Sequence, residues 1–176
     1  MMQKGEFNLP LLLISLIVIL GVFLGSYFLY QKIGITDPLV TQISALDSID
    51  RVEVNMIDKK YYIKVYITGV DSIQKTYLII DDLAAKGLRD NEYEIKIVDN
   101  RDQSLEEAYY RLQPAIYEAL ATNRYRWLQE EIASQLNNQG EFQFFIDENH
   151  FYLQLNRGER YLYEIINRNP QYISTS

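Results

Sequence analysis

The sequence predicts an α+β protein with one membrane-spanning helix at its N-terminus and a soluble body behind it. Three observations support this prediction: an uncharged run over residues 9–30, several later segments in which apolar residues alternate, and segments between them with apolar residues at helical spacing. The roughly 140 residues that follow the run can form one domain or two small ones. We therefore expect small α/β modules attached to a membrane anchor.

The anchor is predicted from 22 consecutive residues, 9–30, none of which is charged. As a helix this run would be about 33 Å long, which covers a bilayer core of about 30 Å. It ends in the bulky sequence Tyr-Phe-Leu-Tyr at residues 27–30, whose rings favour the headgroup region, and not in the small residues of a signal-peptide cleavage site. We expect an uncleaved transmembrane helix that contacts the lipid bilayer, after a short tail at residues 1–8. A cleaved signal peptide and a type IV prepilin leader are the alternatives.

Charges beside the run indicate its orientation. Lys4 and the α-amino group lie before it, whereas Lys32 is the one cation in the linker at residues 31–36. Positive charge favours the cytoplasmic side, so we expect the body to be extracytoplasmic at the cell membrane, and the reverse orientation is the alternative. The chain has no cysteine, which excludes disulfides and a lipid-modified cysteine.

Gly21 and Gly25 lie four residues apart within the run. Glycines at this spacing share one helix face and let two helices approach closely, so the pair predicts helix–helix packing in the membrane, for example in a homo-oligomer. The alternative is that these are ordinary glycines of a membrane helix.

The first α/β module is predicted over residues 37–100, beginning at the helix-start signal Asp37-Pro38. The pattern predicts a helix, two strands around a turn at Asp58-Lys59, a second helix opened by Asp71 and Gln74 as a capping box, and a third strand. The supporting segments, in that order, are residues 39–46, 51–57, 61–67, 73–84 and 93–97.

A linking helix is predicted at residues 101–123, with a capping box at residues 104–107 and a kink or end at Pro114. A second, smaller module is predicted at residues 124–176. It comprises a helix, two strands around a turn at residues 147–149, a last helix capped by Asn156 and Glu159, and a short strand; these elements lie near residues 128–136, 142–146, 151–155, 160–166 and 171–174. The repeated order suggests two copies of one unit, and two unrelated hairpins in one domain are the alternative.

The order helix–strand–strand–helix–strand over residues 37–98, and loosely over residues 124–174, resembles that of ring-building motif domains. These are small α/β modules of membrane-anchored secretion and sporulation complexes that pack side by side into rings. The resemblance implies assembly at a membrane.

Charge and residue content narrow the function. The net charge is −7 and no basic stripe is present, which disfavours nucleic-acid binding. The single histidine, His150, lies beside a predicted turn and has no cysteine or second histidine to act with, so it is expected at the surface. We expect no catalytic site, no cofactor and no bound metal, and thus no enzyme.

Acidic residues are a further group of candidate catalytic or metal-binding side chains. The pairs at residues 81–82, 106–107 and 130–131 lie on predicted helices, where neighbouring side chains point about 100° apart, so solvated faces are expected. Residues 99–102 have carboxylates at the spacing of a calcium loop but lack its glycine, so a turn and an N-cap are predicted there.

Tyrosine is abundant, with 15 residues in the chain. Tyr62, Lys64 and Tyr66 share one face of a predicted strand, because successive side chains point to opposite faces. They are a candidate partner surface, since tyrosine is enriched at interfaces; alternatively, helices cover both faces of the sheet. The opposite, core-facing residues would be Ile63, Val65 and Ile67.

Two functions follow from these expectations. The preferred one is a single-pass, membrane-anchored, non-enzymatic protein of the cell envelope that acts as an interaction or assembly module, with itself or with another envelope protein as partner. The alternative is a membrane-tethered ligand-binding or sensory domain that recognises a peptide or a polysaccharide.

Overall fold

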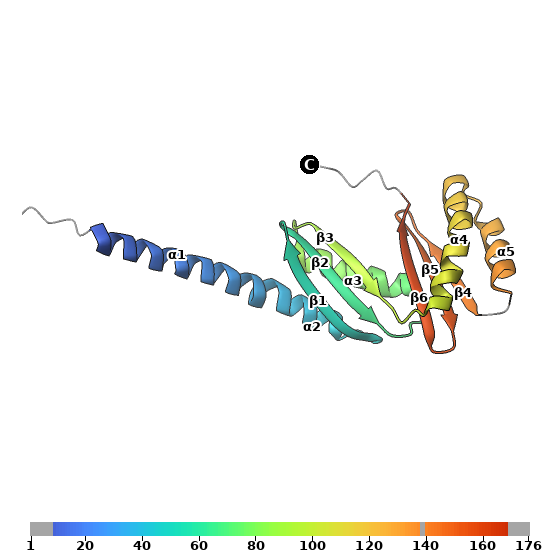
Figure 1. Cartoon of the computed structure of the whole chain (residues 1–176), viewed down its shortest axis with the longest axis horizontal. Helices are drawn as coiled ribbons and strands as arrows, with labels where there is room; N and C mark the ends of the chain where they lie inside the picture. Colours follow the sequence, from blue (N-terminus) through green and yellow to red (C-terminus); the bar gives the residue numbers. More distant parts are fainter. Residues whose placement is uncertain (1–8, 138–139, 169–176) are drawn as a thin grey trace, which may run out of the picture.

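The computed structural model describes residues 9–137 and 140–168, except for the side chains of residues 9, 11 and 27–33. A long N-terminal helix extends from one end of the body, and two three-stranded sheets follow one another towards the other end (Figure 1). The described elements are α1 Leu9–Gln31, η1 Lys32–Thr36, α2 Asp37–Ser44, β1 Ile49–Ile57, β2 Lys60–Ile67, α3 Ile73–Leu88, β3 Tyr93–Val98, α4 Gln103–Thr122, α5 Tyr125–Leu136, β4 Glu141–Ile146, β5 His150–Arg157 and β6 Arg160–Asn167. The α+β class is therefore confirmed.

The N-terminal helix α1 is 23 residues long and is connected to the body without a break in helical structure. The connection is the π-helical turn η1, which leads directly into α2, so the linker expected at residues 31–36 is helical. The large apolar side chains described in α1 from residue 12 to residue 24 are between 47% and 76% exposed.

The described side chains of α1 are those of Pro10 and residues 12–26. Within these limits no helix is sufficiently long and apolar to cross a membrane.

The first sheet, here called sheet A, has the strand order β1-β2-β3. β1 and β2 form an antiparallel hairpin whose turn at Asp58 and Lys59 has positive φ at both residues, as in the turns that match the twist of hairpins. β3 is parallel to β2, and α3 provides the crossover that a parallel pair requires. The element order predicted for residues 37–100 is confirmed.

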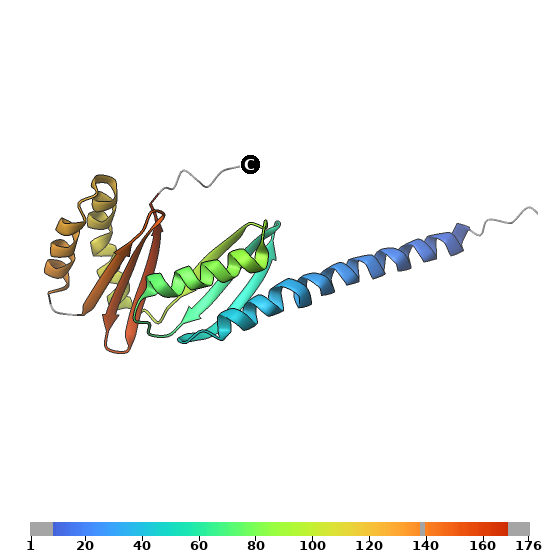
Figure 2. The same cartoon turned by 180° about the vertical axis from the view of Figure 1, so that it is seen from behind.

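Helices α2 and α3 cover one face of sheet A, which is seen from the helix side in Figure 2. Hydrophobic burial against this face forms the first core, whose fully buried members include Leu39, Ile43, Ile63, Val65, Ile73, Ile80 and Ala84. The N-cap of α3 is Ser72, whose hydroxyl accepts from the Lys75 amide, so the predicted cap at Asp71 is wrong by one residue. The opposite face is turned towards the viewer in Figure 1, and no helix of the described chain lies over it.

The second sheet, sheet B, is an antiparallel meander with the order β4-β5-β6. The helix predicted near residues 160–166 is therefore wrong: this segment is β6, and the expected cap at Asn156 and Glu159 is a hairpin turn with Gly158 at φ +61°. Because sheet B is covered on both faces, β6 carries apolar residues at consecutive positions, which resemble helical spacing. The second module is thus a helix followed by three strands and does not repeat the first; the strand predicted at residues 171–174 lies outside the described residues.

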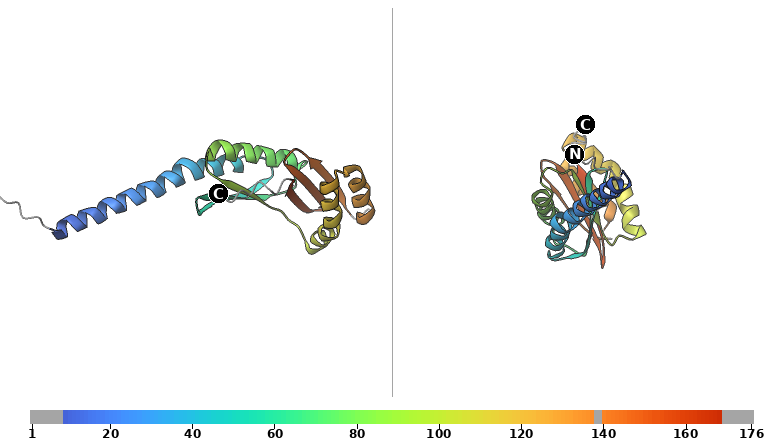
Figure 3. Two further views of the ribbon diagram at one scale, coloured as in Figure 1. Left: turned by 90° about the horizontal axis from the view of Figure 1, so that it is seen from above. Right: turned by 90° about the vertical axis from the view of Figure 1, so that its left-hand side faces the viewer.

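Sheet B is packed between two layers (Figures 1 and 3). On one face, α4 and α5 pack against Phe151, Leu153 and Leu155 in the second core. On the other face, Tyr152 and Tyr163 join the core of sheet A, so the two modules share hydrophobic packing. The linking helix α4 continues through Pro114 to Thr122. Its N-cap is Asp102, as predicted for residues 99–102, and not the first residue of the capping box predicted at residues 104–107.

Candidate functional site

The predicted tyrosine surface lies on the uncovered face of sheet A. Ile63, Val65 and Ile67 are buried beneath the sheet, whereas Tyr62 is 38% exposed on the other side, so the predicted alternation along β2 is confirmed. Tyr66 is half-buried, because the guanidinium carbon of Arg51 lies 4.0 Å from the centre of its ring. We call this surface the open face; its members are Arg51, Glu53, Asn55, Ile57, Lys60, Tyr62, Lys64, Tyr66, Glu94, Lys96 and Val98.

At the end of the open face near the β1–β2 turn, Lys60 contacts both Tyr62 and Glu94. Its ammonium lies 5.4 Å from the centre of the Tyr62 ring and donates to Glu94 Oε2 at 2.8 Å. The hydrogen bond to Glu94 raises the pKa of Lys60. Tyr62 is therefore flanked by an ion pair that links β2 to β3.

The middle of the open face carries two neighbouring lysines. Lys64 is opposite Lys96 in the parallel register and opposite Glu53 in the antiparallel one. The Glu53 carboxylate, however, lies 3.3 Å from the guanidinium of Arg51. Among the described residues, no ion pair is found for Lys64 or Lys96. This part of the surface is therefore cationic.

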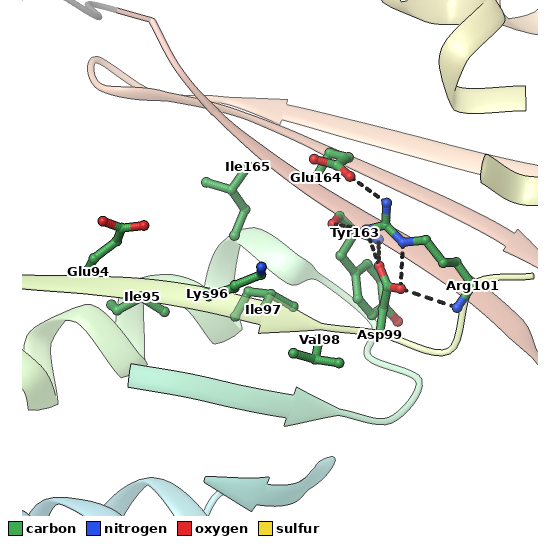
Figure 4. Close-up of a pocket in the computed structure, with 10 residues that line it drawn as sticks. All are labelled: Glu94, Ile95, Lys96, Ile97, Val98, Asp99, Arg101, Tyr163, Glu164 and Ile165. Atoms are coloured by element: carbon green, nitrogen blue, oxygen red, sulfur yellow. Dashed lines mark hydrogen bonds and ion pairs between the residues drawn. The ribbon is translucent and has the colours of Figure 1, made fainter. Parts of the chain in front are cut away.

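A groove of about 610 Å³ lies beside the open face, between β3 and β6 (Figure 4). One wall is β3 from Glu94 to Val98, and the other is formed by Tyr163, Glu164 and Ile165 of β6. Both strands are at the edge of their sheet in the described structure. The groove is closed at one end, where the Tyr163 amide donates to Asp99 Oδ2 at 2.7 Å.

That closed end is built around Arg101. Its guanidinium donates to both carboxylate oxygens of Asp99, at 2.8 and 2.7 Å, and to Glu164 Oε1 at 2.7 Å (Figure 4). Burial acts to lower the pKa of Arg101, but the hydrogen bonds to Asp99 and Glu164 outweigh it and raise this pKa. The Asp99 side chain is 2% exposed, so the cluster is a largely buried ionic link between the two modules.

Sequence reasoning did not identify this cluster. The sequence predicts a turn at Asp99 and Arg101 and a helix at Glu164, but Glu164 lies in β6. The charge pattern of residues 99–102 was the available signal, and Asp102 does cap α4 as an N-cap there. Hydrogen bonds from Ser104 and from the Leu105 amide lower the pKa of Asp102.

A second polar link between the modules is Gln154, which is 1% exposed. Its amide oxygen accepts from the Ile73 N–H at 3.2 Å, and its amide nitrogen donates to the Val70 carbonyl at 2.9 Å. The Val70 N–H in turn donates to the Tyr163 hydroxyl at 3.0 Å. Side chains of sheet B are therefore hydrogen-bonded to the backbone of the loop that leads into α3.

His150, which was expected at the surface, is half-buried. Its ring centre lies 5.4 Å from that of Tyr77, and its Nδ1 is 3.5 Å from the Tyr152 hydroxyl. Burial raises the pKa of Tyr77 to about 12. Burial also acts to raise the pKa of Asp147, but hydrogen bonds from Tyr152, His150 and Asn149 outweigh it and lower this pKa. These hydrogen bonds to the Asp147 carboxylate stabilise the predicted turn at residues 147–149.

The acidic pairs predicted to be solvated make local contacts. Asp82 pairs with Lys86 at 2.5 Å one turn along α3, whereas Asp81 accepts from the Tyr93 hydroxyl at 2.9 Å. Glu106 and Glu131 likewise accept from side chains one turn along their own helices. The described contacts do not bring the two members of these pairs to a common site.

The remaining candidate residues are Gly21 and Gly25 of α1. A Cβ atom added at either position would meet no heavy atom of the described structure within 4 Å. This helix face therefore has room for a neighbouring helix, and the predicted packing stays a prediction.

Comparisons with protein-family models, with curated proteins and with solved structures find no match for this chain. The resemblance to ring-building motif domains therefore rests on the element order of residues 37–98.

Proposed function

We propose that this chain is a single-pass, membrane-anchored, non-enzymatic protein of the cell envelope whose body acts as an interaction or assembly module. The observation that carries the proposal is α1, a 23-residue helix that extends away from the body and whose large apolar side chains, described from residue 12 to residue 24, are exposed. A helix that is apolar all round requires apolar surroundings, which a bilayer provides. In this proposal residues 9–30 cross the membrane and the body is extracytoplasmic.

The interaction role is supported by the body. The open face presents Tyr62, Lys64 and Tyr66 without a covering helix in the described structure. Tyrosine buries a large area at interfaces while its hydroxyl remains satisfied. Gly21 and Gly25 offer a second contact, between membrane helices of a homo-oligomer or with an envelope partner.

The anchor is tested by adding charges to α1. In the wild type, the protein should stay in the membrane pellet after alkaline carbonate washing. The variant L16R/L20R should move to the supernatant, because each arginine costs about 2.5–3.5 kcal/mol at the centre of a membrane helix. The matched control is L78R, which puts arginine at an exposed leucine of α3 and should stay in the pellet. Wild-type protein in the supernatant would refute the anchor.

Orientation is tested separately with intact spheroplasts. Protease added outside should digest the body of the wild type, and addition after lysis is the control for cleavability. Full protection in intact spheroplasts would place the body in the cytoplasm.

The groove between β3 and β6 favours a second candidate function, a membrane-tethered domain that recognises a peptide or polysaccharide. Its volume of about 610 Å³ lies within the usual range of ligand sites. Chemical cross-linking in membranes distinguishes the two functions: multimers favour an assembly module, and monomers that bind a glycan favour recognition.

A further inference from the structure

We propose that the edge of β3 and the open face beside it form a docking site for an acidic peptide, which adds to sheet A as a fourth strand. The inference rests on the proposed role as an interaction module and specifies the partner. The proposal rests on the charge of the open face, on the edge of β3 that pairs with no strand in the described structure, and on the groove next to it.

Charge indicates an acidic partner. The open face carries four cationic and two anionic side chains, although the whole chain has a net charge of −7. Both anions are engaged, Glu53 with Arg51 and Glu94 with Lys60. Lys64 and Lys96 remain side by side, and like charges in opposed positions destabilise a sheet. A carboxylate of a partner would remove this repulsion.

Backbone geometry indicates an extended partner. β3 pairs with β2 on one side, and its other side faces the groove. An exposed strand edge presents N–H and C=O groups that can pair with an added strand. The groove provides space for such a strand between Glu94 and Ile165, up to the end closed by Asp99 and Arg101.

Strand alternation combines the two requirements. Lys96 lies on the open face, whereas its neighbours Ile95 and Ile97 pack against the first core. In a strand added beside β3, every second side chain would lie on the same face as Lys96. The partner that fits is therefore an extended segment with acidic and apolar residues in alternation.

The placement of the open face favours a peptide over a lipid surface. Figure 1 shows α1 running across the view while the open face is turned towards the viewer, so this face looks sideways to the length of α1. If α1 crosses a membrane, the face looks along the membrane plane, where a neighbouring protein can reach it.

The test measures binding of a fluorescent decapeptide of alternating valine and glutamate to the full chain in dodecyl maltoside micelles. Micelles keep the result independent of membrane anchoring, so failure here leaves the carbonate test unaffected. The variant K64E/K96E should bind the peptide at least about tenfold more weakly. The control K75E/K86E makes the same charge change at two exposed lysines of α3 and should bind like the wild type.

Three further probes complete the test. A valine–lysine decapeptide should not bind. Glutamate peptides with N-methyl groups at odd or at even positions should differ, because an added strand directs alternate N–H groups towards β3. Micelles are replaced by phosphatidylglycerol vesicles without peptide to detect lipid binding.

The outcomes decide the inference. Equal loss of binding in K64E/K96E and K75E/K86E, or no loss in either, would overturn the site. Equal binding of the two N-methylated peptides would overturn strand addition. Vesicle binding that depends on Lys64 and Lys96, without peptide binding, would assign the face to lipid instead. Circular dichroism melting shows whether each variant is folded.

Discussion

Replacing Gln154 by leucine tests whether polar contacts hold the two modules together. Gln154 is fully enclosed and bonds at both ends to backbone groups, the Ile73 N–H and the Val70 carbonyl. Ile73 is the first residue of α3, so its N–H has no partner within the helix. Leucine has a similar size but leaves the buried Ile73 N–H and the partly buried Val70 carbonyl without these hydrogen bonds. At about 1–3 kcal/mol for each, the variant should lose about 2–6 kcal/mol of unfolding free energy.

The matched control is Gln143→Leu. Gln143 lies opposite Gln154 in the β4–β5 register but is exposed, so this change should alter stability by less than about 0.5 kcal/mol. The assay is urea unfolding of the full chain in detergent micelles, followed by the fluorescence of Trp127 next to the second core. If both variants have the same unfolding free energy, Gln154 does not link the modules and the reasoning is refuted.

Three other predictions concern the strand face, the glycine pair and the dependence on pH. Replacing Tyr62 and Tyr66 by serine should lower the free energy of unfolding by no more than about 1 kcal/mol. Val65→Ala, at a fully buried position of the same strand, should lower it by about 1–4 kcal/mol through lost burial and a cavity. Urea unfolding measures both, and an unfolded tyrosine variant would show that these side chains belong to the core. Replacing Gly21 and Gly25 by isoleucine should weaken self-association in a membrane reporter assay, because the added side chains hold the helices apart. The control replaces Leu16 and Leu20 by isoleucine. An unchanged signal in the glycine variant would show that the glycines have no packing role. The lowered pKa of Asp147 means that the folded protein binds fewer protons than the unfolded chain, so its stabilisation is present above the ordinary value of 3.8 and is lost as the pH falls through the lowered pKa. Asp147→Asn should flatten the acid side of the curve of unfolding free energy against pH, and an unchanged slope would contradict the assignment.

The sequence predicts sheet A well because its strands have one buried and one open face. Val65 and Ile67 alternate with Lys64 and Tyr66, and this period of two leaves a clear pattern. β6 has no such contrast: Leu162 packs against the α4–α5 layer while Tyr163 packs into the core of sheet A. Periodicity cannot identify a strand that is buried on both sides.

The contacts between the modules could not be predicted either. Arg101 meets Glu164 across 63 positions of sequence, and Gln154 meets Ile73 across 81. Local patterns carry no signal for such distant partners. Helix caps could be predicted to within one or two residues. Asp71 and Ser72 are adjacent and both can cap a helix, so the sequence does not show that Ser72 is the N-cap of α3.

Because η1 connects α1 directly to α2, the three segments form one continuous helical rod. Because the backbone stays helical from α1 to α2, a rotation of α1 about its own axis would be expected to rotate the body about the same axis. Each α-helical residue advances by about 100°, so deleting one residue from η1 would turn the body through roughly that angle relative to α1. If α1 crosses a membrane, the number of residues in η1, which is five, would thus determine the direction within the membrane plane in which the open face points.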